Sequence, residues 1–288
     1  MRLLTVLTAL LVSTSISLSA IAETFTFTAI PDQDESRLQE RFGQVAAYLQ
    51  KELGVDVKYV PVKSYAAAVT AFRNNQVQLA WFGGLSGVQA RELVPGSEAI
   101  AQGYEDQFFV TYIIANHTTG LSKSEDFPKA IADKRFTFGA KGSTSGRLMP
   151  EFYIREYFKK SPEKIFKRVG FSDDHSRTIA LVQSGAYEVG AVNYKVWEDE
   201  LAAGIIDPSR VSVIWQTPSY PDYQWSIRGD IDKRFGAGFK AKVAETLLAI
   251  SAPEILAAFP RQSFVKASNS DYQPIKDTAI AIGLMDAE

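Results

Sequence analysis

Hydrophobic and polar residues follow two periods in the first part of the chain. Residues 24–30 alternate between apolar and polar positions, which is typical of a strand with one buried face. After Ser36 the apolar side chains recur every three or four residues, as they do along one face of a helix. These positions are Leu38, Phe42, Val45, Ala46, Leu49 and Leu53, and Gly54 closes the predicted helix.

Similar elements then repeat in two sets. The first set continues with predicted strands at 55–62 and 77–84 and a predicted helix at 64–75. After a long apolar stretch at 107–116, a second set alternates in the same way. Its predicted strands and helices lie at 135–140, 147–160, 166–171, 176–185 and 187–193. Because parallel strands are joined by helical crossovers, this alternation predicts an α/β fold.

The chain of 288 residues is long enough for two lobes of ordinary size. We expect residues 23–112 and 218–288 to form the first lobe and residues 113–217 to form the second. The chain would then cross between the lobes twice, near 107–116 and near 215–228. Two crossings predict a hinge between the lobes.

Residues 1–22 have the features of a secretory signal peptide. Arg2 gives a positive start, a short apolar run follows, and a small-x-small cleavage site ends at Ala22. The apolar run is interrupted by Ser and Thr and is shorter than the roughly 20 residues of a membrane span. We therefore expect a mature, periplasmic protein that begins at Glu23.

The composition excludes several classes of partner and chemistry. The formal net charge is −2, and acidic and basic residues are interspersed, so no nucleic-acid partner is expected. The chain has no cysteine, which argues against disulfides and against a lipid anchor attached to cysteine. Two histidines without cysteines or clustered carboxylates make a metal site unexpected, and no cofactor is expected.

The stretch FGAKGSTSG at 138–146 joins a predicted strand to a predicted helix. It places Ser143, Thr144 and Ser145 at the helix start, where backbone N–H groups lack intrahelical acceptors and the helix dipole is positive. Ordinary N-capping needs only one such hydroxyl. Three hydroxyls in a row between glycines therefore indicate a binding site for a small oxyanion.

Two catalytic interpretations of this stretch fail on spacing. A G-x-S-x-G nucleophile elbow would have Thr144, and not a serine, at its centre. A phosphate-binding nucleotide loop needs lysine after its second glycine, whereas Lys141 precedes Gly142. The stretch therefore favours binding over covalent chemistry.

Further candidate contacts lie where predicted strands end or where the chain crosses between lobes. In open α/β sheets these positions border the ligand crevice. The candidates are Tyr65, Trp81, Phe82, His175, Asn193, Tyr194, Asp222 and Tyr223. Each of these residues could instead lie in the core, cap a helix or lie on the surface. We expect His117 to lie in a surface loop.

Together these stretches resemble the periplasmic substrate-binding proteins of phosphate, phosphite and phosphonate ABC transporters. The similarity runs from residues 29–54 through 65–84 and 142–146 to the turn at His175 and the strand at 189–193. The stretches WFGGLSGVQAR, FTFGAKGSTSGRLMPE and YPDYQWSIRGD make the chain most similar to the branch that carries a selenate-binding label.

The resemblance implies a type II periplasmic-binding-protein fold with two lobes, each a mixed sheet flanked by helices, joined by two hinge crossings. It implies that the lobes close on a small oxyanion and that a permease in the inner membrane receives it. The implied contacts are Tyr65, Trp81, Phe82, Ser143, Thr144, Ser145 and His175. No catalytic activity is implied, and we expect a monomer.

The chain departs from this family at two places. The family often has a tyrosine where residues 81–83 read Trp-Phe-Gly. It also often has an acid after the strand that ends at Asn193, where it holds the amine of an aminophosphonate. Tyr194 and Lys195 stand there instead, which argues against aminophosphonates.

The identity of the anion depends in part on Asp222. A buried carboxylate repels a fully ionised selenate or sulfate, but it accepts a hydrogen bond from a protonated phosphate or phosphite oxygen. An inward Asp222 favours the phosphorus oxyanions, and an outward one leaves selenate and sulfate open.

Two other functions are compatible with the sequence. A periplasmic hydrolase would use Ser145 as nucleophile and His175 as base, with Asp173 or Asp174 orienting the ring. A ligand sensor would bind the same anion but signal to a membrane receptor.

Overall fold

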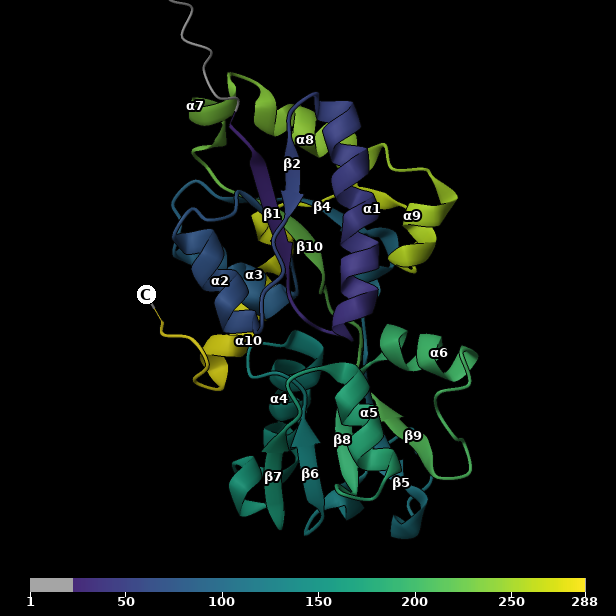
Figure 1. Cartoon of the computed structure of the whole chain (residues 1–288). Coiled ribbons are helices and arrows are strands. Elements are labelled where there is room, and N and C mark those ends of the chain that lie inside the picture. Colours follow the sequence, from purple (N-terminus) through teal and green to yellow (C-terminus); the bar gives the residue numbers. More distant parts are fainter. Residues whose placement is uncertain (1–22, 288) are drawn as a thin grey trace, which may run out of the picture.

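The computed structural model describes residues 23–287, so the predicted signal peptide lies outside the described residues. The chain forms two sheets, each flanked by helices, and Figure 1 shows one above the other. No helix within residues 23–287 is long and apolar enough to cross a membrane.

The first sheet has six strands from both ends of the chain. They are β1 (Phe25–Ala29), β2 (Val57–Tyr59), β3 (Leu79–Phe82), β4 (Glu98–Gly103), β10 (Gln224–Ile227) and β11 (Phe264–Lys266). Their spatial order is β11-β4-β10-β3-β1-β2. Strands β2, β1 and β3 are parallel, whereas β10 is antiparallel to β3 and β4, and β11 is antiparallel to β4.

Seven α-helices of the described chain accompany this sheet. They are α1 (Glu35–Leu53), α2 (Tyr65–Arg73), α3 (Gly84–Glu92), α7 (Ile231–Phe235), α8 (Phe239–Leu248), α9 (Pro253–Ala258) and α10 (Gln273–Ala281). The longest, α1, begins after Asp34, whose carboxylate accepts hydrogen bonds from the backbone N–H groups of Ser36 and Arg37. It ends at Gly54, whose φ of 73° lies in the left-handed region that favours glycine. Its buried side chains are the predicted face, except that Ala46 is half-buried.

The second sheet has five strands from the middle of the chain. They are β5 (Thr111–Asn116), β6 (Arg135–Phe138), β7 (Arg168–Phe171), β8 (Val189–Asn193) and β9 (Val211–Gln216), in the order β7-β6-β8-β5-β9. Strands β7, β6 and β8 are parallel, and β5 is antiparallel to β8 and β9. The accompanying α-helices are α4 (Met149–Phe158), α5 (His175–Gln183) and α6 (Tyr194–Ala202). Both sheets are therefore mixed, and the predicted α/β class is confirmed.

Two short segments connect the sheets. The chain leaves the first sheet after β4 and returns to it between β9 and β10. The segments run side by side, because Phe109 and Tyr220 exchange two backbone hydrogen bonds of 2.9 Å. Thr111 adds a bond from its backbone N–H to the Thr217 hydroxyl, 3.0 Å long. The lobe boundaries after residues 112 and 217 stay predictions, as does the hinge.

Candidate oxyanion-binding site

The predicted helix start at the hydroxyl run is formed, but with an unusual first turn. Residues Thr144–Leu148 form a π-helical turn that continues directly into α4. Ser143 precedes it, and its hydroxyl accepts a hydrogen bond from the Gly146 N–H at 2.9 Å. Because hydrogen bonds in a π turn run to the carbonyl five residues earlier, the first N–H groups have no intrahelical acceptor.

The hydroxyl run is buried where the two lobes meet. Ser143, Thr144 and Ser145 are each at most 2% exposed. The Thr144 hydroxyl accepts a hydrogen bond from the Leu85 N–H at 3.0 Å, and Leu85 lies in the first turn of α3 in the other lobe. A Cβ atom at Gly84 would lie 3.3 Å from the Thr144 hydroxyl, so glycine permits this close approach. The starts of two helices from different lobes thus face one another.

Asp222 lies beside Thr144 in this interface. One of its carboxylate oxygens, Oδ1, accepts a hydrogen bond from the Gly84 N–H at 2.8 Å. The other, Oδ2, is buried and has no hydrogen-bond partner among the described residues. Burial raises the pKa of Asp222 to about 7, although its hydrogen bonds with Gly84 and Thr144 act in the opposite direction. The sequence left its orientation open, and the structure places it at the hydroxyl run.

His175 is the first residue of α5 and lies on the other side of Ser145. Its Nε2 atom is 3.5 Å from the Ser145 hydroxyl oxygen, and its Nδ1 atom accepts a hydrogen bond from the Asn193 N–H at 3.3 Å. The accepting role of Nδ1 leaves the ring hydrogen on Nε2. Burial lowers the pKa of His175 to about 3, so the ring is neutral at physiological pH and presents an N–H donor toward Ser145.

Tyr65 approaches the hydroxyl run from the first lobe. It is the first residue of α2, is 4% exposed, and its hydroxyl interacts with Ser143. Burial raises the pKa of Tyr65 well above its usual value, which keeps the phenol protonated and able to donate. Its ring also borders a surface cleft of about 1040 Å³ that continues along Ala140, Lys141 and Gly142.

The two cationic side chains that flank the hydroxyl run in the sequence are engaged elsewhere. Arg147 pairs with the buried carboxylate of Glu151, which also binds Arg155. Lys141 is exposed and stands over the ring of Phe171. An anion at the hydroxyl run would therefore be held by neutral N–H and O–H dipoles.

Trp81 and Phe82 occupy a different environment from the one expected for a ligand wall. Trp81 stacks on Tyr223 and packs edge-on against Phe259 in the first lobe. Phe82 packs against Phe72 at a ring distance of 5.6 Å. Core packing thus accounts for the contacts of both rings, and their predicted ligand contact stays a prediction.

Asn193, Tyr223 and Tyr194 bond to or pack against other protein groups, and no hydrogen bond among the described residues joins their side chains to the hydroxyl run. The Asn193 side chain caps α6 by accepting from the Lys195 and Val196 N–H groups, and its amide donates to the Tyr223 hydroxyl. Tyr194 is half-buried against the rings of Phe109 and Tyr112.

Backbone groups are the part of the site that residue types could not indicate. The Leu85 N–H bonds to Thr144 across the interface, and the Gly84 N–H bonds to Asp222 of the second connecting segment. The glycine pair at the end of β3 was the available signal, because it allows a helix start to approach another chain segment closely. Among residues 23–287, no group of three or more His, Cys, Asp or Glu side chains is arranged to hold a metal ion.

Known proteins are similar to this chain in sequence and in fold. The family described as "ABC transporter, phosphonate, periplasmic substrate-binding protein" matches residues 27–272. The chain is 41% identical over 256 residues to the "Probable ABC transporter phosphite binding protein PhnD1" of Prochlorococcus marinus, with 86% of each chain covered.

Solved structures show the same fold. PhnD1 from Prochlorococcus marinus in complex with methylphosphonate matches with a TM-score of 0.87 and 40% identity over 91% of this chain and 99% of that one. A binding protein component of an ABC phosphonate transporter from Pseudomonas aeruginosa matches with a TM-score of 0.80 and 20% identity, over 90% and 86% of the two chains. The two-lobe type II fold is therefore confirmed, and the chain belongs to the family of periplasmic substrate-binding proteins of phosphonate ABC transporters.

Proposed function

We propose that this protein captures a small phosphorus oxyanion, such as phosphite, methylphosphonate or phosphate, and delivers it to a membrane permease. The anion rests on the π-helical turn at Ser143, Thr144 and Ser145, and Tyr65 and His175 donate further hydrogen bonds. Closure of the lobes removes water, and each hydrogen bond to the charged ligand then contributes about 1.5–3 kcal/mol.

The unpaired, buried Oδ2 atom of Asp222 is the observation that carries the choice of anion. A fully ionised sulfate or selenate would place negative charge against this carboxylate. A protonated phosphorus oxyanion instead supplies the hydrogen that the ionised Oδ2 can accept. The solved relative in complex with methylphosphonate supports this class of ligand.

A melting-temperature panel tests the proposal. Phosphite, methylphosphonate, phosphate, sulfate, selenate and selenite are each added to the purified mature protein. A ligand at about 100 times its dissociation constant adds roughly 2.7 kcal/mol, which corresponds to a shift of roughly 5–10 °C for a chain of this size. Shifts with phosphorus oxyanions alone support the proposal. No shift with any of them, or equal shifts with sulfate and selenate, would refute it.

The geometry at Ser145 does not support the hydrolase alternative. A base in a catalytic triad donates its Nδ1 hydrogen to an acid, but Nδ1 of His175 accepts from the Asn193 N–H. Asp174 instead caps α5 through the Arg177 N–H at 2.6 Å. We expect no turnover of generic ester or phosphoester substrates. Sensing and transport bind the ligand alike, and uptake by cells with and without this protein separates them.

Two further properties belong to the same proposal. Residues 1–22 are removed on export, so N-terminal sequencing of periplasmic protein should begin at Glu23. The mature protein is a monomer, which light scattering with and without phosphite should show.

A further inference from the structure

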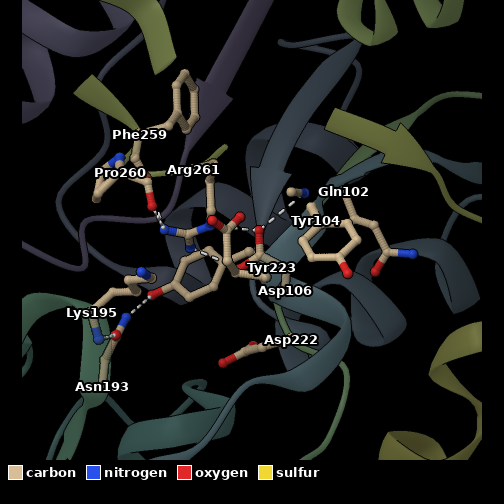
Figure 2. Close-up of polar contacts among 12 residues, drawn as sticks. Gln102, Tyr104, Asp106, Asn193, Lys195, Asp222, Tyr223, Phe259, Pro260 and Arg261 are labelled. Carbon is tan, nitrogen blue, oxygen red and sulfur yellow. Dashed lines mark hydrogen bonds and ion pairs between the residues drawn. The ribbon is translucent and has the colours of Figure 1, made fainter. Parts of the chain in front are cut away.

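A series of buried hydrogen bonds joins the two lobes beside the hydroxyl run. Asp32 follows β1 in the first lobe, Tyr223 precedes β10 in the second connecting segment, and Asn193 ends β8 in the second lobe. The Tyr223 hydroxyl donates to Asp32 Oδ2 at 2.7 Å and accepts from the Asn193 amide at 2.9 Å. Figure 2 shows the Asn193 amide directed at the Tyr223 hydroxyl. All three residues are at most 4% exposed.

A backbone hydrogen bond ties the same lobes together directly. The Asp32 carbonyl oxygen accepts from the His175 N–H at 3.0 Å. The His175 ring lies between the Asn193 N–H and the Ser145 hydroxyl, so it contacts both this series and the proposed ligand site. Closing the lobes therefore assembles the Asn193–Tyr223 and His175–Asp32 bonds and the ligand site together.

The space around these residues is too small for a ligand. A cavity of about 10 Å³ lies between Asp32, Asn193 and Tyr223 and is lined by residues of both lobes. That volume is at the lower limit for a single water molecule, and a tetrahedral anion does not fit. The hydrogen-bonding groups of Tyr223 and Asn193 are also occupied by one another and by Asp32.

From this geometry we infer that Asp32, Tyr223 and Asn193 form a closure latch, which holds the lobes together without contacting the ligand. The inference rests on the proposed function, because it concerns how tightly the same site binds. The observed affinity of a ligand that binds only the closed form is its intrinsic affinity multiplied by the fraction of closed molecules. A latch that raises this fraction strengthens the binding of every ligand by the same factor. Tyr223 is then a positioning residue and not a ligand contact.

Charge on both lobes supports the latch. Burial raises the pKa of Asp32, whereas the nearby Arg41 on α1 and the hydrogen bond from Tyr223 favour its ionised form. Asp199 on α6 of the second lobe also interacts favourably with Arg41. Opening the lobes would separate Arg41 from Asp199, while water would solvate Asp32 and Asn193.

Tyr223→Phe is the direct test. The variant removes one hydroxyl. In the closed form the buried Asp32 carboxylate and Asn193 amide then lack this partner, whereas in the open form water can solvate both groups. The dissociation constants for phosphite, methylphosphonate and phosphate should each rise by roughly tenfold to a hundredfold, with their ratios unchanged. The dissociation rate of phosphite should rise, and X-ray scattering of the ligand-free protein should show a larger radius of gyration than in the wild type.

Two other variants complete the design. Tyr112→Phe is the matched control, because it removes a tyrosine–carboxylate bond of 3.1 Å between β5 and Glu198 of α6, both beside the second sheet, and should leave affinities and scattering unchanged. Asn193→Asp keeps an oxygen that can cap α6 but replaces the amide donor to Tyr223 with an acceptor. It should weaken all three ligands to a similar extent, and thermal unfolding checks that each variant is folded.

The outcomes separate the latch from the proposed function. A change in the ratios of the dissociation constants for Tyr223→Phe would show that Tyr223 contacts the ligand, and unchanged constants would show that it holds nothing closed. Either result overturns the latch while wild-type binding upholds the proposed function. If the wild type binds no oxyanion, the scattering comparison of Tyr223→Phe with Tyr112→Phe still tests the latch. Equal radii would then refute it.

Discussion

Replacing Asp222 with asparagine should change which anions this protein binds. The Gly84 N–H can still donate to the amide oxygen at the position of Oδ1, so the contact between α3 and the second connecting segment is preserved. At the position of Oδ2, the variant has an N–H₂ group, which donates hydrogen bonds, in place of a carboxylate oxygen, which accepts them. The variant therefore no longer matches a protonated phosphorus oxyanion, but it matches a fully ionised one.

The size of the effect follows from the environment of the carboxylate. A hydrogen bond between a buried charged group and its partner contributes about 1.5–3 kcal/mol, so Asp222→Asn should weaken phosphite and methylphosphonate roughly 10-fold to 150-fold. Sulfate and selenate should gain affinity, because the carboxylate that repels them is gone and a donor replaces it. The opposite signs matter more than either magnitude, since a general loss of packing would weaken all anions.

Isothermal titration calorimetry at pH 7 with phosphite, methylphosphonate, sulfate and selenate measures these changes on the wild type and the variant. Ser270→Ala is a suitable control, because the Ser270 side chain is exposed and its hydroxyl pairs with that of Ser268 at 2.8 Å and not with Asp222. Equal weakening of all four anions in Asp222→Asn would contradict the role given to Oδ2. So would tight binding of sulfate by the wild type.

Other perturbations should act as follows. Folding raises the pKa of Asp222 from 3.8 to about 7, so its stabilising contribution is full below about pH 4 and is lost as the pH rises through about 7. In Asp222→Asn, the unfolding free energy measured with urea should therefore depend less on pH across this range. Replacing residues 143–145 with alanine should abolish the melting-temperature shift caused by phosphite while leaving the protein folded by circular dichroism. Since the pKa of His175 is about 3, its titration should not affect phosphite affinity between pH 5 and 8, whereas His175→Ala should weaken binding about tenfold in calorimetry. Arg261→Met should lower the unfolding free energy by about 3–5 kcal/mol in urea titrations. The reason is that the buried Asp106 carboxylate loses the two hydrogen bonds of 2.7 and 2.8 Å that it accepts from Arg261, which Figure 2 shows.

The sequence predicted local features well, because neighbouring residues determine them. The apolar face and glycine end of α1 follow from spacing alone, and the hydroxyl run lies at a helix start as its position after β6 indicated. The parallel parts of both sheets also follow from the alternation of strands and helices. Strands β4, β10 and β11 escaped that analysis, because they pair antiparallel with segments far away in the chain and no crossover helix announces them.

The surroundings of individual side chains were less predictable, because they depend on partners that are distant in sequence. Tyr223 and Asn193 are 30 residues apart, and nothing near either of them indicates that they bond to each other. Trp81 lies near the end of β3, where ligand contacts are often found, but its ring packs against Tyr223 and Phe259. The π-helical turn was equally hidden, since a sequence that starts an α-helix and one that starts a π turn look alike.

The arrangement divides two tasks between neighbouring sets of residues. In the proposed site, the donors at the hydroxyl run are neutral and do not distinguish one small anion from another. The ionisation of Asp222 makes binding depend on the number of protons that the ligand carries. Asp32, Tyr223 and Asn193 act on the equilibrium between open and closed lobes, which is common to all ligands. Selectivity and strength of binding should therefore vary independently. A double variant of Asp222→Asn and Tyr223→Phe should show the altered anion preference of the first and the uniform weakening of the second, with free energies that add within about 0.5 kcal/mol. A larger deviation would mean that the two sets act on one another through His175, which contacts both sides.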